Sequence, residues 1–325
     1  MIGQPWREAA AAGLMGLGLA VVAMPAYLGW ARTRGWGQAI RAEGPRDHLS
    51  KAGTPTMGGL VLLAAGLLAG FWWPHPSWDL LIFRLLVVAC AALGLVDDLK
   101  KVLRNRNLGL RARDKLAVQA LLGLGMGAWL VATRPDPGVW LPGIGFVAGA
   151  WLVWLFALMV TAGTMNAVNL TDGLDGLAGG TGAVALLAYA VVAGGTGHPD
   201  LAVAATGLAG ACLGFLWFNS FPARVFMGDT GSLGLGGALA ALALLTRTEL
   251  LLVLIGGVFV AEAGSVILQV AWFKSTGGRR IFRMSPLHHH FEMGGLHEVQ
   301  VTTRFVLVGV VLAVAGVLLY LGGLP

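Results

Sequence analysis

Apolar stretches long enough to cross a bilayer alternate with short polar loops along almost the whole chain. A transmembrane helix needs about 20 mainly apolar residues, and ten stretches meet or approach that length. They cover residues 9–31, 57–73, 80–96, 116–133, 144–165, 176–194, 200–218, 231–246, 250–273 and 304–323. The pattern therefore predicts an all-α, polytopic integral membrane protein with about ten transmembrane helices, forming one transmembrane domain over residues 1–325.

The composition excludes an ordinary soluble enzyme. Hydrophobic residues make up 57% of the chain and charged residues only 12%, which is typical of proteins that lie mostly in lipid. The 50 glycines favour close helix packing in the membrane. The net charge of +6 is not a nucleic-acid signal, because the basic residues sit in short loops beside apolar spans. Both cysteines lie in apolar stretches and indicate neither a disulfide framework nor a zinc site.

The distribution of lysine and arginine predicts the orientation. Eighteen of the 22 basic residues fall in the loops after the first, third, seventh and ninth spans, and four fall on the other side. The positive-inside rule places the crowded loops in the cytoplasm. Both termini then lie on the opposite side of the membrane from the cytoplasm.

Four polar motifs interrupt the apolar pattern, and all lie in or beside the predicted cytoplasmic loops. They are the acid pair at 97–98, the run NAVNLTDGLDGL at 166–177, the segment FMGDTGS at 226–232, and SPLHHHFE at 285–292. Acidic groups near the membrane are costly and usually mark a site. Carboxylates beside glycines, lysines and histidines favour Mg²⁺ and phosphate chemistry.

The acid pair has two interpretations. Asp97 and Asp98 are adjacent, so on a helix their side chains diverge by about 100° and can share one aqueous pocket but not one direction. They are suited to binding a metal–phosphate complex. Alternatively, Asp97 and Lys101 are spaced i, i+4 and could form a plain ion pair.

The second motif repeats a polar group every three residues, at Asn166, Asn169, Asp172 and Asp175. On an α-helix such groups would spiral away from one face, whereas a turn or 3₁₀ segment would keep them together. Helix capping is the alternative, since Asn and Asp favour caps, but it accounts for only one or two of the four.

The remaining polar groups each have a functional and a structural interpretation. Asp229 could bind metal or cap the eighth span, and both roles suit phosphate at a helix N-terminus. The three histidines at 288–290 cannot all bind one metal from regular structure, so hydrogen bonding to anionic oxygens is favoured over zinc or a solvated turn. Lys51 could bind phosphate or lie at the membrane edge, and Lys115 could anchor the fourth span.

Taken together, the motifs resemble the signatures of the phospho-N-acetylmuramoyl-pentapeptide transferase family. The matching elements are Ser50-Lys51 to Gly59, Asp97-Asp98 with Lys115 downstream, Asn166 to Leu177, Phe226 to Ser232 and Pro286 to Glu292. They occur in that family's order and the ten-span pattern covers nearly the whole chain. The HHHFE ending favours this family over relatives that transfer N-acetylglucosamine phosphate.

The resemblance implies a reaction and a site. It also implies that residues 1–325 form a single transmembrane catalytic domain in a bacterial inner membrane, with periplasmic termini and the active site on the cytoplasmic face. Phospho-MurNAc-pentapeptide would pass from UDP-MurNAc-pentapeptide to undecaprenyl phosphate in the bilayer, giving lipid I and UMP, with Mg²⁺ as cofactor. It implies a metal site at Asp229 and Asp172. The implied catalytic residues are Asp97, Asp98, Lys115, Asp172 and Asp175. The implied substrate-binding residues are Lys51, Asn166, Asn169, Phe226, His288, His289 and His290.

Several alternatives stay open at this stage. A related polyprenyl-phosphate GlcNAc-1-phosphate transferase would share most motifs, and a cation-coupled transporter would also bury acids, although near the bilayer midplane. Either a carboxylate attacks the sugar-linked phosphate or the lipid phosphate attacks it directly; direct attack is favoured, because a phosphate monoester is already largely dianionic at neutral pH. The oligomeric state is open, with a homodimer as one candidate.

Overall fold

Long helices dominate the fold, and this confirms an all-α, polytopic architecture. The computed structural model describes residues 3–37, 51, 53–71, 75–104, 109–141 and 144–323. Ser50, and residues 72–73 at the predicted end of the second span, lie outside them. Within the described part, nine helices are long and apolar enough to cross a membrane. They are α1 (Gln4–Thr33), α3 (Trp78–Leu103), α4 (Ala112–Thr133), α5 (Ala150–Thr171), α6 (Leu177–Gly195), α7 (Pro199–Asn219), α8 (Gly228–Leu245), α10 (Gly257–Ser275) and α12 (Glu298–Leu321).

The second predicted span forms a shorter element. Helix α2 (Gly59–Ala69) has 11 residues, so it is only about 16 Å long and does not cross the hydrocarbon core by itself. It packs among α1, α7 and α8. Neighbouring helices therefore surround this segment and cover much of its apolar surface.

A β-hairpin replaces the start of the fifth predicted span. Strands β1 (Gly138–Leu141) and β2 (Gly145–Ala148) pair antiparallel, with Val139 opposite Val147. The turn depends on Gly145, whose φ of +95° is readily adopted only by glycine. The predicted helical start at residue 144 was therefore wrong, and α5 begins at Ala150.

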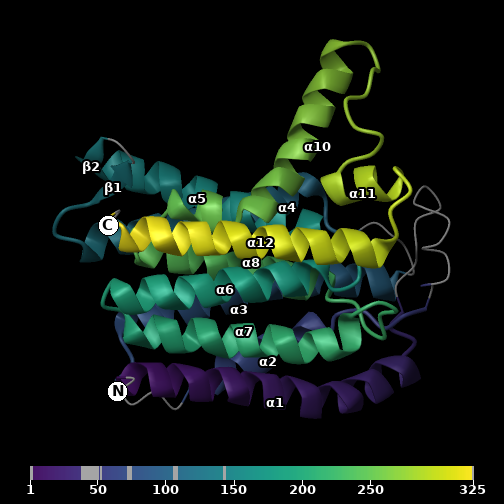
Figure 1. The fold of residues 1–325 in the computed structure, drawn as a ribbon, viewed down its shortest axis with the longest axis horizontal. Coiled ribbons are helices and arrows are strands. Elements are labelled where there is room, and N and C mark those ends of the chain that lie inside the picture. The colour runs from purple at the N-terminus through teal and green to yellow at the C-terminus, as the bar shows by residue number, and fades with distance from the viewer. Residues whose placement is uncertain are drawn as a thin grey trace.

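The ninth predicted span is divided in two. The short helix α9 (Leu251–Ile255) ends at Gly256, and α10 follows directly. Figure 1 shows α10 leaving the bundle at a steep angle and leading to the short helix α11 (Leu287–Glu292). The break turns the polar 276–297 segment back toward the end of the bundle.

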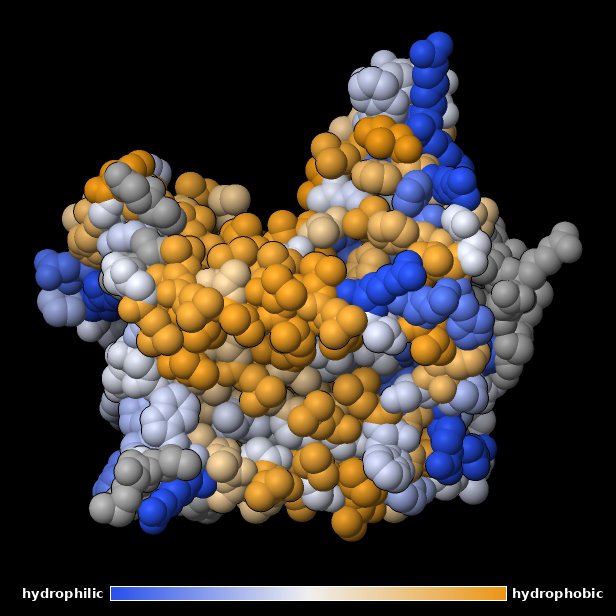
Figure 2. All heavy atoms as spheres, in the orientation of Figure 1, coloured by the Kyte–Doolittle hydropathy of each residue, from blue (hydrophilic) through white to orange (hydrophobic). Residues whose placement is uncertain are grey.

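Helix α8 lies at the centre of the molecule. Of the residues in its 18-residue apolar stretch, 89% are buried, compared with 17% in the corresponding stretch of α12. The reason is that α2, α3, α5 and α6 all pack on α8. Figure 2 shows apolar side chains across the middle of the bundle and hydrophilic side chains gathered near its ends. This distribution is expected of a bundle that spans a bilayer.

The two chain termini lie at the same end of the bundle in Figure 1. The polar motifs gather at the other end, where α3 ends and α8 and α12 begin. Their position follows from the alternating directions of successive helices. That this end faces the cytoplasm is a prediction from the basic residues.

Candidate active site

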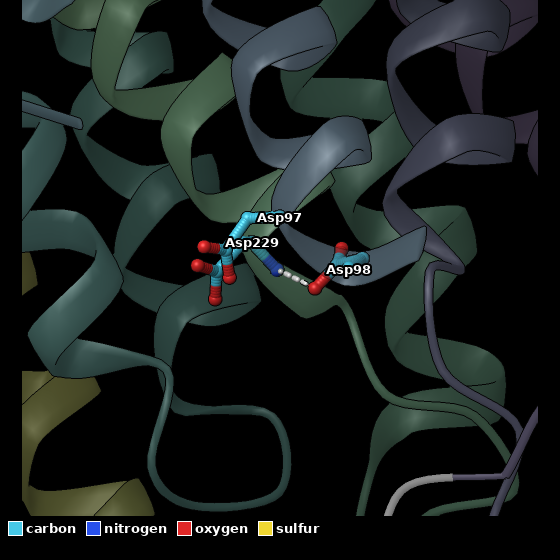
Figure 3. A group of neighbouring side chains, drawn as sticks. All are labelled: Asp97, Asp98 and Asp229. Carbon is cyan, nitrogen blue, oxygen red and sulfur yellow. Dashed lines mark hydrogen bonds between the residues drawn. The ribbon is translucent and has the colours of Figure 1, made fainter. Parts of the chain in front are cut away.

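A group of three carboxylates is the centre of the candidate site. Asp97 and Asp98 lie near the end of α3, and Asp229 lies in the first turn of α8. One ligand oxygen from each lies within 4.8 Å of the others. Figure 3 shows the carboxylates of Asp97 and Asp229 side by side, while Asp98 faces the backbone of Asp229. The side chains of Asp97 and Asp98 point in different directions, as expected for adjacent residues on a helix. The two acids therefore have different partners.

Asp98 binds the N-terminus of α8. Its carboxylate accepts hydrogen bonds from the backbone N–H of Asp229 (3.1 Å), the N–H of Thr230 (2.8 Å) and the Thr230 hydroxyl (2.8 Å). Free N–H groups at a helix start attract a carboxylate. Asp98 therefore fixes α8 against α3 and so places Asp229 beside Asp97.

Two lysines neutralise the other two carboxylates. The Lys101 ammonium lies 2.6 Å from Asp97 Oδ2 and 3.1 Å from Asp229 Oδ1. The Lys115 ammonium lies 2.6 Å from Asp229 Oδ2 and 3.8 Å from Asp97 Oδ1. The i, i+4 ion pair considered for Asp97 is thus present, but as one part of a four-member network. Lys115 occupies the site that the resemblance implied.

The donor atoms of this cluster suit a hard divalent cation. Asp97 and Asp229 present carboxylate oxygens to a common space, and these are the ligands that Mg²⁺ prefers. Mg²⁺ usually takes one or two protein carboxylates and completes its shell with water and substrate phosphates. The lysines that now balance the negative charge could turn toward the phosphates of a substrate.

The two asparagines of the second motif have different partners. Asn169 Nδ2 donates to Asp229 Oδ1 (3.1 Å) and to the Ser232 hydroxyl (2.8 Å). Asn166 Nδ2 instead donates to the buried Gln119 on α4, at 2.7 Å. Asn169 therefore belongs to the carboxylate cluster, whereas Asn166 joins α5 to α4 beside it.

The expectation that a 3₁₀ segment or turn would hold all four groups of this motif together was wrong. Helix α5 stays α-helical to Thr171, and the chain turns only over the residues before Gly176. Asp172 is the C-cap residue of α5. Burial, and then the negative charges of Asp229, Asp98 and Asp175, raise the pKa of Asp172 to about 8. A bound cation would oppose this rise, so Asp172 is electrostatically part of the centre.

Asp175 forms a second centre with Lys51 and Glu298. The Lys51 ammonium lies 2.8 Å from Asp175 Oδ1 and 2.6 Å from Glu298 Oε1. Glu298 Oε1 also accepts the backbone N–H of Asp175 at 2.7 Å, and Asp175 Oδ2 accepts the N–H of Ala223. Four distant parts of the chain meet here. The two carboxylates exceed the one ammonium in charge, which keeps Lys51 firmly in place.

The three histidines form a short helix, α11, instead of an open loop. His288 is fully buried; its ring nitrogen Nδ1 lies 3.1 Å from Glu262 Oε2, and its backbone N–H donates to Glu262 Oε1. A Cβ added at Gly173 would lie 2.3 Å from His288 Nε2. The His288 ring therefore packs directly against the 172–176 turn at Gly173.

The neighbouring histidines are bound within their own segment. His289 Nδ1 lies 2.7 Å from Glu292 Oε2, and His290 Nδ1 accepts the backbone N–H of Arg283. These contacts stabilise the segment between α10 and α12 internally. Phe226 is joined by backbone hydrogen bonds to Pro55 and Gly58, so it brings the segment after Lys51 beside the start of α8.

Sequence reasoning missed three charged residues of this region. Lys101 was recognised only as an ion-pair partner, although it contacts all three clustered carboxylates within 4.0 Å. Glu262 is a lone acid inside an apolar span, which is itself a signal of function. Glu298 carried no such signal, because an acid in the first turn of a helix is common.

The chain is similar to known proteins over most of its length. Glycosyl transferase family 4 matches residues 80–247, and the phospho-N-acetylmuramoyl-pentapeptide-transferase signature 1 matches residues 51–63. A phospho-N-acetylmuramoyl-pentapeptide-transferase of Shouchella clausii is 46% identical over 95% of this chain and 96% of its own length. This chain belongs to the phospho-N-acetylmuramoyl-pentapeptide-transferase family.

Other members of the family show similar identity. The enzyme of that name from Geobacillus kaustophilus is 47% identical, covering 92% of this chain and 94% of its own length. The enzyme from Heliobacterium modesticaldum is 49% identical, covering 91% of this chain and 92% of its own length. The family 4 match includes the carboxylate cluster but ends before α11 and Glu298, and the narrower signature begins at Lys51. In the second centre, Lys51 and Glu298 lie outside the range matched by glycosyl transferase family 4, whereas Asp175 lies inside it.

Proposed function

We propose that the carboxylate cluster is the catalytic centre of lipid I synthesis in this chain. Phospho-MurNAc-pentapeptide passes from UDP-MurNAc-pentapeptide to undecaprenyl phosphate, with release of UMP, in the peptidoglycan pathway. Family membership over nearly the full length supports this reaction. The main evidence for the site is that Asp97, Asp229 and two lysines lie in contact at one end of the bundle. Such a site can meet a soluble nucleotide and a lipid phosphate together.

Asp97 and Asp229 would hold Mg²⁺. Asp172 would interact electrostatically with the same ion. When bound, it would neutralise the diphosphate of the donor and polarise the phosphorus that is attacked. Asp98 keeps α8 in register with α3 through its three hydrogen bonds. It is therefore a positioning residue, while Lys101 and Lys115 supply positive charge to the transferring group.

Direct attack by the lipid phosphate fits this arrangement. Its oxygen forms the new bond to the sugar-linked phosphorus, and the bond from that phosphorus to the UMP oxygen breaks. Asp97 orients the acceptor or takes its remaining proton. Both Asp97 oxygens have cationic or N–H neighbours, Lys101 and Leu110, which favours a charged, orienting carboxylate over a nucleophile.

The second centre would receive the uridine end of the donor. Lys51, Asp175 and Phe226 lie where the segment after residue 51, the 172–176 turn and the start of α8 meet. This gives the donor two contact regions, one for the nucleoside and one for the diphosphate. His288 contributes by supporting the turn, and Asn169 by orienting Asp229.

The direct test is transfer by the purified protein in detergent with Mg²⁺ and undecaprenyl phosphate. Lipid I and UMP are expected with UDP-MurNAc-pentapeptide, and no product is expected with UDP-GlcNAc. Product from UDP-GlcNAc alone would favour the related GlcNAc-1-phosphate transferases. A transporter is disfavoured, because the acids lie at helix ends instead of on broken helices at the midplane.

The order of bond formation is tested without the acceptor. Labelled donor incubated with the enzyme and Mg²⁺ should release no stoichiometric UMP if the lipid phosphate attacks directly. UMP release with label retained on Asp97 or Asp98 would rule that mechanism out.

A further inference from the structure

A pocket of about 570 Å³, lined by both apolar and charged side chains, lies at the end of the bundle away from the carboxylate cluster. It forms where α3 begins and where α4, α6 and α8 end, and its lining includes Trp78, Asp79, Arg134 and Arg247. Asp79 and Asp97 are both on α3, and their 18-residue separation corresponds to about 27 Å. That distance is close to the thickness of a bilayer's hydrocarbon core. The pocket therefore lies at the membrane interface opposite the catalytic centre.

Two arginines give this pocket its chemistry. Arg134 is partly buried and donates to the C-terminal carbonyls of Leu244 and Leu245 through Nη2, while its Nη1 is buried without a partner in the described structure. Arg247 lines the same pocket, and its guanidinium lies 5.9 Å from the centre of the Phe146 ring. Its φ of +57° belongs to the C-terminal cap of α8, where the Thr248 N–H donates to the Ala243 carbonyl.

No described carboxylate forms an ion pair with either arginine. The nearby acids are weak or already engaged. Asp79 accepts the Trp129 indole N–H at 3.0 Å and faces His198 at 3.7 Å. Glu249 is only 3% exposed, and burial raises its pKa to about 7 against the opposing charges of Arg134 and Arg247. The two arginines thus have two acids in their surroundings, but among the described residues neither guanidinium is held in a direct ion pair.

The surroundings fit the headgroup region of a membrane. Trp78 is 71% exposed and Trp129 is a partly buried neighbour, and tryptophan is enriched at membrane interfaces. Ser77, Thr133 and Thr196 also line the pocket, but their hydroxyls already donate to Asp200, to the Trp129 carbonyl and to the Val192 carbonyl, so the arginines are the candidate phosphate donors. Guanidinium groups bind phosphate oxygens through paired, charge-assisted hydrogen bonds. We propose that this pocket binds the phosphate group of a lipid headgroup in the leaflet opposite the catalytic centre.

Occupancy would join several helices that carry catalytic residues at their other ends. A phosphate held by Arg134 and Arg247 would link the ends of α4 and α8, and its lipid would lie against the start of α3. A ligand that binds only the folded protein raises the temperature of unfolding. The pocket would therefore stabilise the bundle without contacting the substrates.

Native mass spectrometry of the detergent-purified protein tests the proposal. The probes are dioleoyl-phosphatidylglycerol, dioleoylglycerol, which lacks the phosphate, and inorganic phosphate alone. The wild type should retain phosphatidylglycerol and gain thermal stability from it, and should not respond to dioleoylglycerol. Protection by inorganic phosphate equal to that by the lipid would overturn the headgroup assignment and show a free-phosphate site instead.

The variant Arg247→Gln should weaken phosphatidylglycerol retention about tenfold, the loss expected for one charged hydrogen-bonding group. The matched control is Arg7→Gln, which removes an exposed arginine in the first turns of α1, outside the pocket. Equal loss in both variants would show general charge attraction and overturn the site, as would unchanged binding in Arg247→Gln. Arg134→Gln is the secondary variant, because it also removes the hydrogen bonds to the end of α8.

Discussion

At the scale of single residues, the balance of charge decides what the candidate site can do. The Lys101 and Lys115 ammonium groups lie between the carboxylates of Asp97 and Asp229. Without them, two close carboxylates would repel each other. A cation bound in their place would make the same lysines available to substrate phosphates. The protein thus keeps an acidic site intact before its substrates arrive.

Asp229→Asn should reduce transfer by at least about 100-fold, the usual effect of removing one electrostatic group from such a centre. Asparagine keeps the size but lacks the negative charge that Mg²⁺ prefers. Raising the Mg²⁺ concentration should recover part of the activity, which a titration of rate against metal would measure. A normal rate with normal metal dependence would remove Asp229 from the metal site.

Glu298→Gln should raise the apparent KM for UDP-MurNAc-pentapeptide about tenfold and change kcat less. The substitution weakens the hold on Lys51 and on the Asp175 N–H, which depend on the Glu298 carboxylate. Steady-state kinetics with each substrate varied in turn would measure this, and the KM for undecaprenyl phosphate should not change.

The matched control for Glu298 is Asp114→Asn. Asp114 is also an acid in a first helical turn, on α4, but its side chain is 51% exposed and contacts only Arg113 among the described ion pairs. It should leave both KM values unchanged. Equal effects of the two variants would assign the change to helix-end charge instead of to the Lys51 contact.

Glu249→Gln should alter how stability depends on pH. Burial raises the pKa of Glu249 from its ordinary 4.5 to about 7, so the folded state holds a proton that the unfolded state releases. The stabilising contribution is complete below pH 4.5 and is lost as pH rises through 7. The difference in Tm between wild type and variant should therefore decline from pH 5 to pH 8. Parallel Tm curves over that range would contradict the raised pKa.

At the scale of elements, close contact between α3 and α8 sets the geometry of the carboxylates. A Cβ at Gly94 would lie 2.1 Å from the Asp229 carbonyl oxygen, so only glycine lets the two helices approach this closely. Small residues at helix contacts serve this purpose in membranes. The distance between Asp97 and Asp229 thus depends on a residue without a side chain.

Gly94→Ala should separate α3 from the start of α8 and lower transfer by at least about tenfold, because small misplacements of catalytic groups are costly. The control is Gly125→Ala on α4, where nothing lies within 4 Å of the added Cβ. That variant should keep full activity and be stabilised by up to about 1 kcal/mol. Activity assays with thermal unfolding of both proteins test this, and full activity in Gly94→Ala would contradict the tight contact.

At the scale of the whole molecule, the two ends of the bundle differ in chemistry. The end with the carboxylate cluster also carries the basic loops, and the other end carries the hairpin and the arginine pocket. The positive-inside rule predicts that the first end is cytoplasmic. Only this orientation gives the site access to a cytoplasmic nucleotide.

Single cysteines should label from opposite sides of the membrane. Arg104→Cys, at the exposed C-cap of α3, should react with an impermeant reagent only from the cytoplasm. Ile144→Cys, near the hairpin turn and 74% exposed, should react only from the periplasm. The natural cysteines Cys90 and Cys212 are buried and give little background. Labelling of both positions from one side would contradict the predicted topology.

The sequence by itself determined most of the helical spans, the polar motifs and the family. These depend on local signals, since a run of apolar residues must form a helix in lipid and short motifs keep their spacing in any fold. It also located Asp97, Asp98 and Asp229 as acids at span ends. The hairpin at 138–148 was missed, because its apolar residues continue a pattern that resembles a span.

Only the tertiary structure decided which polar groups meet. Glu298 is 247 residues from Lys51 in the chain but 2.6 Å from its ammonium, and no local pattern encodes such a contact. Asp98 and Asp97 are neighbours in sequence, yet one binds the α8 backbone and the other faces Asp229. The packing of α3 on α8 separates these roles, because partner choice depends on directions and distances that arise only when the helices assemble.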